Sequence, residues 1–189
     1  MPKAERRDQL LAVAMTIVRE EGADALTLGT LATRAGVSRP IAYDHFSTRP
    51  RLLLALFQQL EDRYIQSLRT ALAAVPGRLY SVADVMSSAY FSCHAEMGLE
   101  GPSISAALKG NAEMAQRQQA MIDEYVDLMR DALRPFASVD DERLRLICTG
   151  LLGAAEAMAR EVHAGRSSKA AATSAWSSLI VRSVAKPSS

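Results

Sequence analysis

The chain has 189 residues, of which 49% are hydrophobic, 23% charged and 5% aromatic, and its 22 basic and 21 acidic residues leave a formal net charge of +1. This length allows one or two small domains with buried cores. The charge excludes both a charged disordered chain and a general polyelectrolyte binder. The longest segment without a charged residue, 170–181, has twelve residues, too few for the roughly 20 of a membrane-spanning helix. The two cysteines provide neither a disulfide framework nor a zinc cluster, so we expect a cytoplasmic protein.

The first predicted element is a helix over residues 4–21. Its apolar residues, among them Leu10, Val13 and Ile17, recur at helical spacing opposite a basic and polar face. The same segment superficially resembles a signal peptide. However, only two leucines precede Ala12, where a signal peptide has about 7 to 15 apolar residues. We therefore interpret it as a helix of the folded domain.

Capping residues define two further short helices. Thr27 and Ser38 are favourable N-cap residues for helices over 28–35 and from 39 to about 46. Gly36 supplies the left-handed residue that ends the former helix. Three short helices, two of them joined by a tight turn, predict a helix-turn-helix.

The remainder of the chain shows helical periodicity, and no strand pattern competes with it. Thr48 is the N-cap of a longer helix. The predicted helices lie near 50–74, 79–97, 103–109, 112–134, 140–164 and 168–184. The expected fold is all-α, with an N-terminal three-helix helix-turn-helix domain over 1–48 and a helical-bundle regulatory domain over 49–189.

The segment from Thr27 to Phe46 resembles the signature of the TetR family of transcriptional regulators. It has a threonine opening the second helix, Leu-Ala before an Ala-Gly-Val-Ser turn, and then Tyr-Asp-His-Phe. The likeness covers about the first quarter of the chain. Ala42, where the family mostly has a larger aliphatic residue, and Gly29, inside the second helix, depart from the pattern. The resemblance implies a homodimeric, ligand-responsive repressor that a small effector releases from a palindromic operator in double-stranded DNA.

The charges and side chains also favour DNA independently of the resemblance. Residues 1–51 carry a net charge of +2 and the remainder −1, so one copy is expected to bind weakly and a dimer is needed. The start of the helix over residues 39 to about 46, the latter helix of the helix-turn-helix, is expected to enter the major groove. There Arg39 is able to form two hydrogen bonds with O6 and N7 of guanine. Pro40 is able to contact a thymine methyl group, and Asp44 to accept a hydrogen bond from a cytosine amine.

Other side chains of the motif are expected to contact the DNA backbone. Tyr43 and His45 suit phosphates, and Thr27, Ser38 and Arg49 resemble the backbone-contacting positions of the family. The alternatives are that the hydroxyls only cap helices, that the tyrosine packs half-buried and that the arginines are merely solvated. The predicted DNA-contacting residues are Thr27, Arg34, Ser38, Arg39, Pro40, Tyr43, Asp44, His45 and Arg49.

The last two predicted helices are almost uncharged on one face and carry small residues such as Gly150 and Gly153. Small residues let another helix approach closely, which favours a two-fold interface of four helices. A core within one chain is the alternative. The predicted dimer interface consists of Leu144, Cys148, Leu151, Leu152, Ala155, Trp176, Leu179 and Ile180.

The middle helices are rich in methionine and aromatic residues, which suit an irregular hydrophobic effector. The predicted pocket residues are Met86, Tyr90, Phe91, His94, Met97, Met114, Met121 and Tyr125. The two tyrosines or the histidine are able to orient a ligand by hydrogen bonding. The alternative is that these side chains simply fill a core.

Catalysis is the weaker prediction. Cys93, His94 and Glu96 suggest a metal or catalytic site, but adjacent helical residues point about 100° apart and form no ready chelate. The three histidines lie in different segments with no evident nucleophile or carboxylate partner, and no phosphate-binding glycine loop is present. We predict no catalytic residues, no metal and no cofactor. Two alternatives stay open, a helical enzyme or carrier of a hydrophobic molecule and a DNA-binding adaptor without an effector, and sequence-selective DNA binding would separate the former from a regulator.

Overall fold

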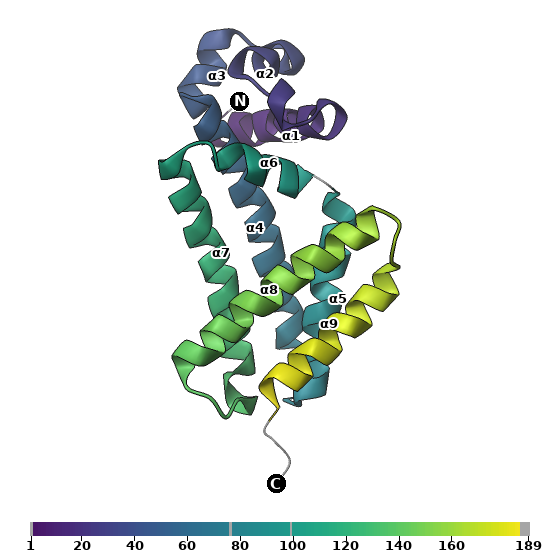
Figure 1. The fold of residues 1–189 in the computed structure, drawn as a ribbon. Coiled ribbons are helices and arrows are strands. Elements are labelled where there is room, and N and C mark those ends of the chain that lie inside the picture. Colours follow the sequence, from purple (N-terminus) through teal and green to yellow (C-terminus); the bar gives the residue numbers. More distant parts are fainter. Residues whose placement is uncertain (1, 76, 99, 186–189) are drawn as a thin grey trace. The chain divides into compact units, whose positions relative to one another are not determined.

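The structure is a computed structural model that describes residues 2–75, 77–98 and 100–185, without the side chains of Glu96 and Met97. Within these ranges the regular structure is helical, which confirms the all-α prediction (Figure 1). Two short 3₁₀ turns, η1 (Ala23–Ala25) and η2 (Arg134–Phe136), follow α1 and α7. No helix in these ranges is both long and apolar enough to cross a membrane. The α-helices are α1 (Lys3–Glu21), α2 (Leu28–Ala35), α3 (Arg39–Phe46), α4 (Arg49–Ala73), α5 (Leu79–Met97), α6 (Glu100–Leu108), α7 (Ala112–Leu133), α8 (Asp141–His163) and α9 (Lys169–Val184).

The predicted helix ends agree with the structure to within one residue, except at the start of α6. That helix begins at Glu100, earlier than predicted, and Pro102 lies in its first turn. Proline is tolerated there because the first N–H groups of a helix have no intrahelical partner. The two 3₁₀ turns were not predicted, since each is a single turn without periodicity.

The chain divides into two compact units whose boundaries lie inside helices. Unit 1 is Met1–Leu60 with Leu99–Met121, and unit 2 is Glu61–Gly98 with Ile122–Ser189. Both α4 and α7 therefore contribute to both units. The boundary predicted after residue 48 lies inside unit 1, because residues 49–60 of α4 and all of α6 group with α1–α3.

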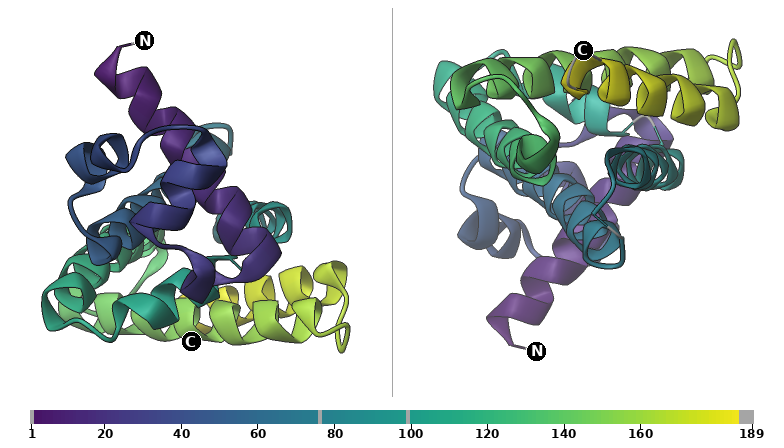
Figure 2. Two further views of the ribbon diagram at one scale, coloured as in Figure 1. Left: turned by 90° about the horizontal axis from the view of Figure 1, so that it is seen from above. Right: turned by 90° about the horizontal axis from the view of Figure 1, so that it is seen from below.

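Unit 1 has a continuous apolar core. The helix α2 packs against both α1 and α3, and α6 packs against α1 (Figure 2). Leu10, Ile17, Leu26 and Leu31 have almost no exposed surface. Ala42 is also fully buried, so the small residue that departs from the family pattern lies in the core.

Two polar contacts attach α6 to α1 and η1. Arg19 Nε lies 2.5 Å from Glu100 Oε1, and the Glu100 residue is only 5% exposed. The backbone N–H of Ala23 donates to Ser103 Oγ at 3.3 Å. A charge-assisted bond to a buried carboxylate is strong relative to a surface pair, so these contacts fix α6 onto the first helix.

Unit 2 is organised around Trp176. Its indole Nε1 donates to the carbonyl oxygen of Leu151 at 2.8 Å, and its ring lies 5.2 Å from Tyr90 and 6.0 Å from Phe91 between centroids. The helix α9, which carries Trp176, packs against both α5 and α8. A buried indole with its N–H satisfied ties the three helices together.

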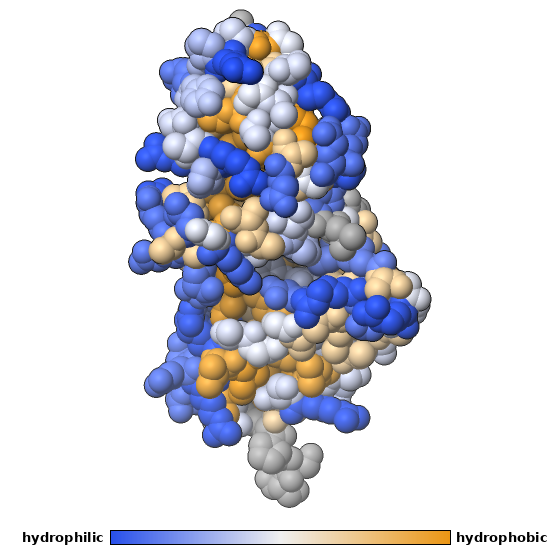
Figure 3. All heavy atoms as spheres, turned by 45° about the horizontal axis from the view of Figure 1, so that its top comes forward, coloured by the Kyte–Doolittle hydropathy of each residue, from blue (hydrophilic) through white to orange (hydrophobic). Residues whose placement is uncertain are grey.

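This core corrects the predicted dimer interface. Seven of the eight predicted residues are buried within the single chain, and Leu179 alone is 37% exposed. The apolar stripes of α8 and α9 face each other and α5, so they form the core that was the alternative prediction. The outer face of α8 instead carries Leu146, which is 72% exposed, with Gly150 and Gly153 also exposed. Figure 3 shows hydrophobic and near-neutral side chains gathered over α8 and α9.

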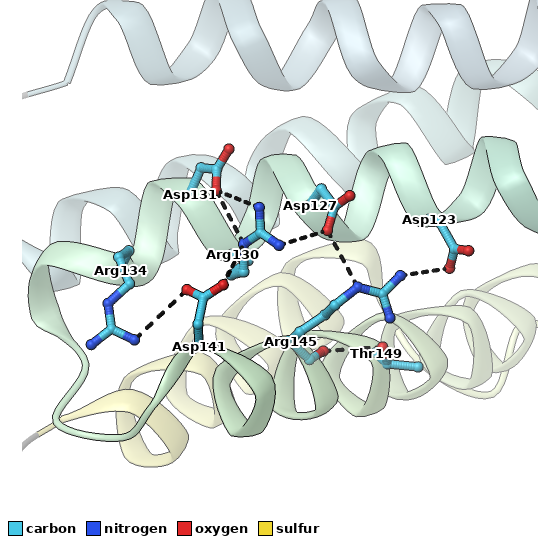
Figure 4. A network of polar contacts seen from close by, with 8 residues as sticks. All are labelled: Asp123, Asp127, Arg130, Asp131, Arg134, Asp141, Arg145 and Thr149. Carbon is cyan, nitrogen blue, oxygen red and sulfur yellow. Dashed lines mark hydrogen bonds and ion pairs between the residues drawn. The ribbon is translucent and has the colours of Figure 1, made fainter.

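A network of ion pairs connects α7 to α8 (Figure 4). Arg145 of α8 lies 3.0 Å from Asp123 and 3.3 Å from Asp127, both on α7. Arg130 of α7 also pairs with Asp127 at 3.0 Å and reaches Asp141 of α8 at 3.7 Å. A single exposed ion pair contributes little to stability, but ion pairs shared among several partners hold the two helices in one register.

Candidate nucleic-acid interface

One exposed face of α3 collects four of the predicted DNA-contacting residues. Arg39, Pro40, Tyr43 and Asp44 are all exposed, and Tyr43 keeps 52% of its surface. Their spacing places them on one side of the helix, while Ala42 and Phe46 bury the opposite side. This exposed face is free to enter a groove.

The turn before α3 forms as predicted. Gly36 has a φ of +65° in the left-handed region, and the N–H of Val37 donates to the carbonyl oxygen of Ala32 at 3.0 Å. This pair of features is the helix-ending turn for which glycine is preferred. It redirects the chain so that α3 projects away from α2.

The two predicted N-caps behave differently. Thr27 Oγ1 accepts from the N–H of Thr30 at 3.0 Å, and Thr30 Oγ1 accepts from the N–H of Thr27 at 2.9 Å, which is a reciprocal capping box. Ser38 occupies the predicted N-cap position of α3, but its side chain makes no capping hydrogen bond. That hydroxyl is exposed at the start of the helix.

A surface depression of about 530 Å³ lies beside α3. Its lining combines hydroxyl groups, two arginines and the first turn of α2, and consists of Thr27, Leu28, Gly29, Arg39, Tyr43, Ser47, Thr48 and Arg49. Helix N-termini with hydroxyls and cations are suited to an anionic group such as a phosphate. A Cβ on Gly29 would make only an ordinary van der Waals contact, 3.6 Å from Thr27 Oγ1.

The chain passes from α3 to α4 through a strained residue. Ser47 has a φ of +61°, and the N–H of Thr48 donates to the carbonyl oxygen of Phe46 at 2.6 Å. A three-residue turn with positive φ is rare and costs energy for a residue with a side chain. The turn brings Thr48 and Arg49 to the edge of the depression, and nothing in the sequence pattern marks it.

Arg49, predicted to contact phosphate, has internal partners. Its Nε donates to the carbonyl oxygen of Leu26 at 2.7 Å, and its Nη2 donates to that of Ala23 at 2.8 Å. These carbonyls belong to η1 and the residue after it. Arg49 therefore fixes the segment that leads into α2, whatever contact it makes with DNA.

Replacing Arg49 with alanine is expected to lower the free energy of unfolding by about 2 kcal/mol, because two hydrogen bonds from a charged donor are lost. Urea denaturation measures this change. Arg51→Ala removes an equal charge from an exposed position two residues further along α4 and is expected to change stability by less than about 0.5 kcal/mol. Equal stability of the two variants would contradict the internal role.

Arg34 also has partners within unit 1. It forms ion pairs with Glu20 and with Glu21, the latter at 2.9 Å. Hydrogen bonding and charge from Glu20, with a smaller contribution from Glu21, raise the pKa of the Arg34 guanidinium. The side chain thus connects α2 to the end of α1, and its predicted DNA contact would require these pairs to open.

The end of α3 is held by α1. Arg7 Nη1 donates to the carbonyl oxygen of His45 at 2.9 Å, and its guanidinium lies 4.8 Å from the centroid of the Phe46 ring. Lys3, one turn earlier, lies with its Nζ 2.9 Å from Asp44 Oδ2. Sequence reasoning missed Lys3, because its partner is 41 positions away and no local signal connects them.

The predicted pocket residues fall in both units. Met86, Tyr90, Phe91, His94 and Tyr125 are buried in unit 2. The other methionines are in unit 1 (Met114 and Met121) or have a side chain outside the described residues (Met97).

The interior of unit 2 also holds polar groups that the sequence analysis did not combine. Tyr64 stacks on Tyr90 with 5.5 Å between ring centroids and meets Tyr125 edge-on at 6.3 Å. His163 Nε2 lies 2.7 Å from His94 Nδ1, so α5 and α8 share a histidine pair. All three contacts join residues far apart in the sequence.

Burial shifts two acid–base groups of this interior in opposite directions. The Glu61 carboxyl has its pKa raised to about 7 by burial, then by the charges of Glu156 and Asp62. His94 has its pKa lowered to about 4, mainly by burial and then by His163. Both groups therefore favour their neutral forms in the folded protein.

Comparisons with known proteins match these features. Residues 10–56 match a family described as bacterial regulatory proteins, tetR family. The transcriptional activator FasR of Mycolicibacterium smegmatis is 40% identical over 72 residues, which are 38% of this chain and 33% of FasR. The transcriptional regulator CymR of Pseudomonas putida is 35% identical over 36% of this chain and 34% of CymR. The chain thus spans about a third of the length of these two relatives.

The fold is matched over a greater length than the sequence. The fatty acid degradation regulator FadR from Bacillus halodurans has a TM-score of 0.77 at 18% identity, over 93% of this chain and 94% of FadR. The TetR-family regulator PfmR from Thermus thermophilus has a TM-score of 0.65 at 19% identity, over 92% and 97%. The helix-turn-helix segment thus matches the tetR family of bacterial regulatory proteins in sequence, and most of the chain shares the fold of these solved structures.

Proposed function

We propose that the chain is a ligand-responsive, sequence-specific DNA-binding transcriptional regulator rather than an enzyme. The observation that carries this proposal is the exposed face of α3 beside a depression suited to phosphate. We further propose that it acts as a repressor on a palindromic operator. FasR, which is 40% identical over 72 residues, is named an activator, so the direction of regulation needs its own experiment.

The exposed face of α3 offers three different contacts with bases. Arg39 is suited to a bidentate contact with guanine O6 and N7, Pro40 to the methyl group of thymine, and Asp44 to the amine of cytosine. Thr27, Tyr43 and the hydroxyl groups around the depression would hold the DNA backbone and fix the register of α3. Together they provide both positioning and sequence readout.

A second copy is needed for useful affinity, since the N-terminal residues carry little net charge. The outer faces of α8 and α9 are proposed as the contact between copies, with Leu146 and Leu179 as exposed apolar residues. Exposed glycines between them allow close helix packing. The dimer would have to place the two α3 helices about 34 to 36 Å apart to reach successive major grooves.

The effector is proposed to bind in unit 2 among the methionine and aromatic side chains around Tyr90. A small hydrophobic molecule suits Met86 and Phe91, and the tyrosine hydroxyls would orient it. Screening small molecules for release of the selected DNA identifies such ligands.

Selection of preferred sequences from a random DNA pool tests the proposal. The most informative comparison is between the wild-type protein and the Arg39→Ala variant. Loss of a bidentate guanine contact is expected to cost about 1 to 3 kcal/mol at one base position of each half-site. Preference at the other positions and the thermal stability are expected to stay unchanged.

Arg63→Ala is the matched control, since Arg63 is exposed on α4 in unit 2. It is expected to retain the wild-type preference at every position. A wild-type protein that enriches no sequence would contradict the proposed function, whereas an Arg39→Ala variant with unchanged preference would contradict only the role of Arg39.

A further inference from the structure

We propose that Lys3 and Asp44 form an ion pair that opens on the correct DNA sequence, where Asp44 accepts from a cytosine amine and Lys3 moves to a phosphate. This inference rests on the proposed DNA-binding function. It adds Lys3, from the first turn of α1, to the residues that determine specificity, and it makes Asp44 a selective element rather than a simple contact.

In the free protein Lys3 and Asp44 are paired, and we call this arrangement the closed state. Lys3 Nζ lies 2.9 Å from Asp44 Oδ2, and the two side chains are 72% and 67% exposed. Hydrogen bonding and charge from Lys3 hold the pKa of the Asp44 carboxyl below its usual range. The carboxylate is therefore ionised at neutral pH and can only accept hydrogen bonds.

An acceptor-only group on a reading helix discriminates strongly. Phosphates and the acceptor atoms of guanine and thymine repel it, whereas the exposed amines of cytosine and adenine donate to it. Cytosine is favoured over adenine because the amine of adenine lies beside its N7 acceptor, which repels the carboxylate. In the closed state Lys3 neutralises the carboxylate, so non-specific DNA meets an ion pair with no net charge. On the correct sequence the cytosine amine replaces Lys3, and the ammonium group is released beside the DNA backbone.

The position of Lys3 is fixed well enough for this exchange. Arg7, one helical turn later, holds α1 against the end of α3 through the carbonyl oxygen of His45 and the ring of Phe46. The backbone carrying Lys3 therefore stays beside Asp44 when the pair opens. The pair itself is exposed, and exposed pairs are weak, so its opening does not prevent binding.

The test compares salt dependence on two DNAs, the selected operator and a random-sequence duplex of equal length. Lys3→Met is expected to reduce the slope of log affinity against log salt by about 0.9 per copy, or about 1.8 for a dimer, on the operator only. That difference corresponds to about a twelvefold smaller loss of affinity between 50 and 200 mM salt. On random DNA the slope is expected to stay at the wild-type value, because there Lys3 remains paired with Asp44.

Asp44→Ala tests the other partner. It is expected to abolish preference at one cytosine position of each half-site and to steepen the slope on random DNA by about 1.8, because Lys3 is then free for phosphate. The double variant Lys3→Met/Asp44→Ala should lose this gain. Lys169→Met, at the start of α9 in unit 2, removes the same charge as a control and should leave both slopes unchanged.

Several results would overturn the proposal. One is an equal change of slope on operator and random DNA in Lys3→Met, which would make Lys3 a general phosphate contact. Another is an Asp44→Ala variant that keeps every base preference. If the wild-type protein enriches no sequence at all, the proposed function fails and this inference fails with it. Thermal unfolding of each variant at the wild-type temperature shows that the fold is retained.

Discussion

A Glu61→Gln variant is expected to be more stable than the wild-type protein at pH 7, by up to about 3 kcal/mol, and to lose this advantage as the pH falls towards 4.5. Burial raises the pKa of Glu61 from 4.5 to about 7 in the folded protein. The folded state therefore binds this proton more tightly than the unfolded state. Its stabilising effect is complete below pH 4.5 and is lost as the pH rises through 7, whereas glutamine stays neutral throughout.

His94 contributes a pH dependence of opposite sign in the same unit. Its pKa is lowered from 6.5 to about 4 in the folded protein, so its contribution is complete above pH 6.5 and is lost as the pH falls through 4. The loss amounts to about 2 kcal/mol, discounted for solvent screening because its partner His163 is only half-buried. In the wild-type protein the two effects oppose each other between pH 4.5 and 6.5.

Substituting either residue should reveal the pH dependence of the free energy of unfolding that the other residue contributes. We expect the free energy of unfolding of Glu61→Gln to fall from pH 6.5 to 4 and that of His94→Asn to fall from pH 4.5 to 7. Urea denaturation across this range measures both slopes, and any constant loss of packing leaves the slopes unaffected. Glu142→Gln, at an exposed position in the first turn of α8, serves as the control and should follow the wild-type curve. Two variants with the wild-type slope would contradict the shifted pKa values.

The helices and the helix-turn-helix were predictable because a few neighbouring residues determine them. The capping threonine Thr27, the left-handed Gly36 and the proline in the first turn of α3 act within one or two turns of the chain. The face of α3 that carries Arg39 and Asp44 follows from helical periodicity alone. These features needed no knowledge of tertiary contacts.

The partners of charged residues were not predictable in the same way. Arg49 was expected at a phosphate, but the carbonyl oxygens it reaches lie 23 and 26 positions earlier. Arg34 finds Glu20 and Glu21 across a turn that sequence reasoning did not place. A positive charge in a DNA-binding motif is compatible with either use, and only the folded geometry shows which contacts the free protein makes.

Apolar stripes posed a different ambiguity. The stripe through Leu144 and Leu151 on α8 is equally suited to a partner helix of the same chain or of a second copy, because both bury the same surface. The structure shows it against Trp176. Leu146, the exposed leucine of α8, lies outside that stripe.

Effector and operator are expected to weaken each other's binding by the same factor, typically about 5- to 150-fold, and Glu100→Gln is expected to reduce that factor by about fivefold or more. Unit 1 includes α6, which follows α5 of unit 2 directly in the chain. The pair between Arg19 and Glu100, 2.5 Å apart, joins α6 to the first helix of the DNA-binding motif. A ligand that changes unit 2 is therefore able to displace that motif through α6, and a neutral amide removes the charge-assisted part of the connection.

The measurement is the affinity of the strongest effector found by screening, with and without operator, in the wild-type protein and in the variant. Operator affinity without effector should change by no more than about twofold. The variant is expected to alter the mutual effect of effector and operator, and not the binding of operator alone. Glu124→Gln makes the same chemical change in an exposed pair with Arg69 in unit 2 and should keep the wild-type factor. Arg19→Gln removes the other partner and should reproduce the loss seen with Glu100→Gln. If both variants keep the wild-type coupling factor, the coupling does not pass through the pair of Arg19 and Glu100. If the wild-type protein binds the effector equally well with and without operator, the sensor mechanism itself is contradicted.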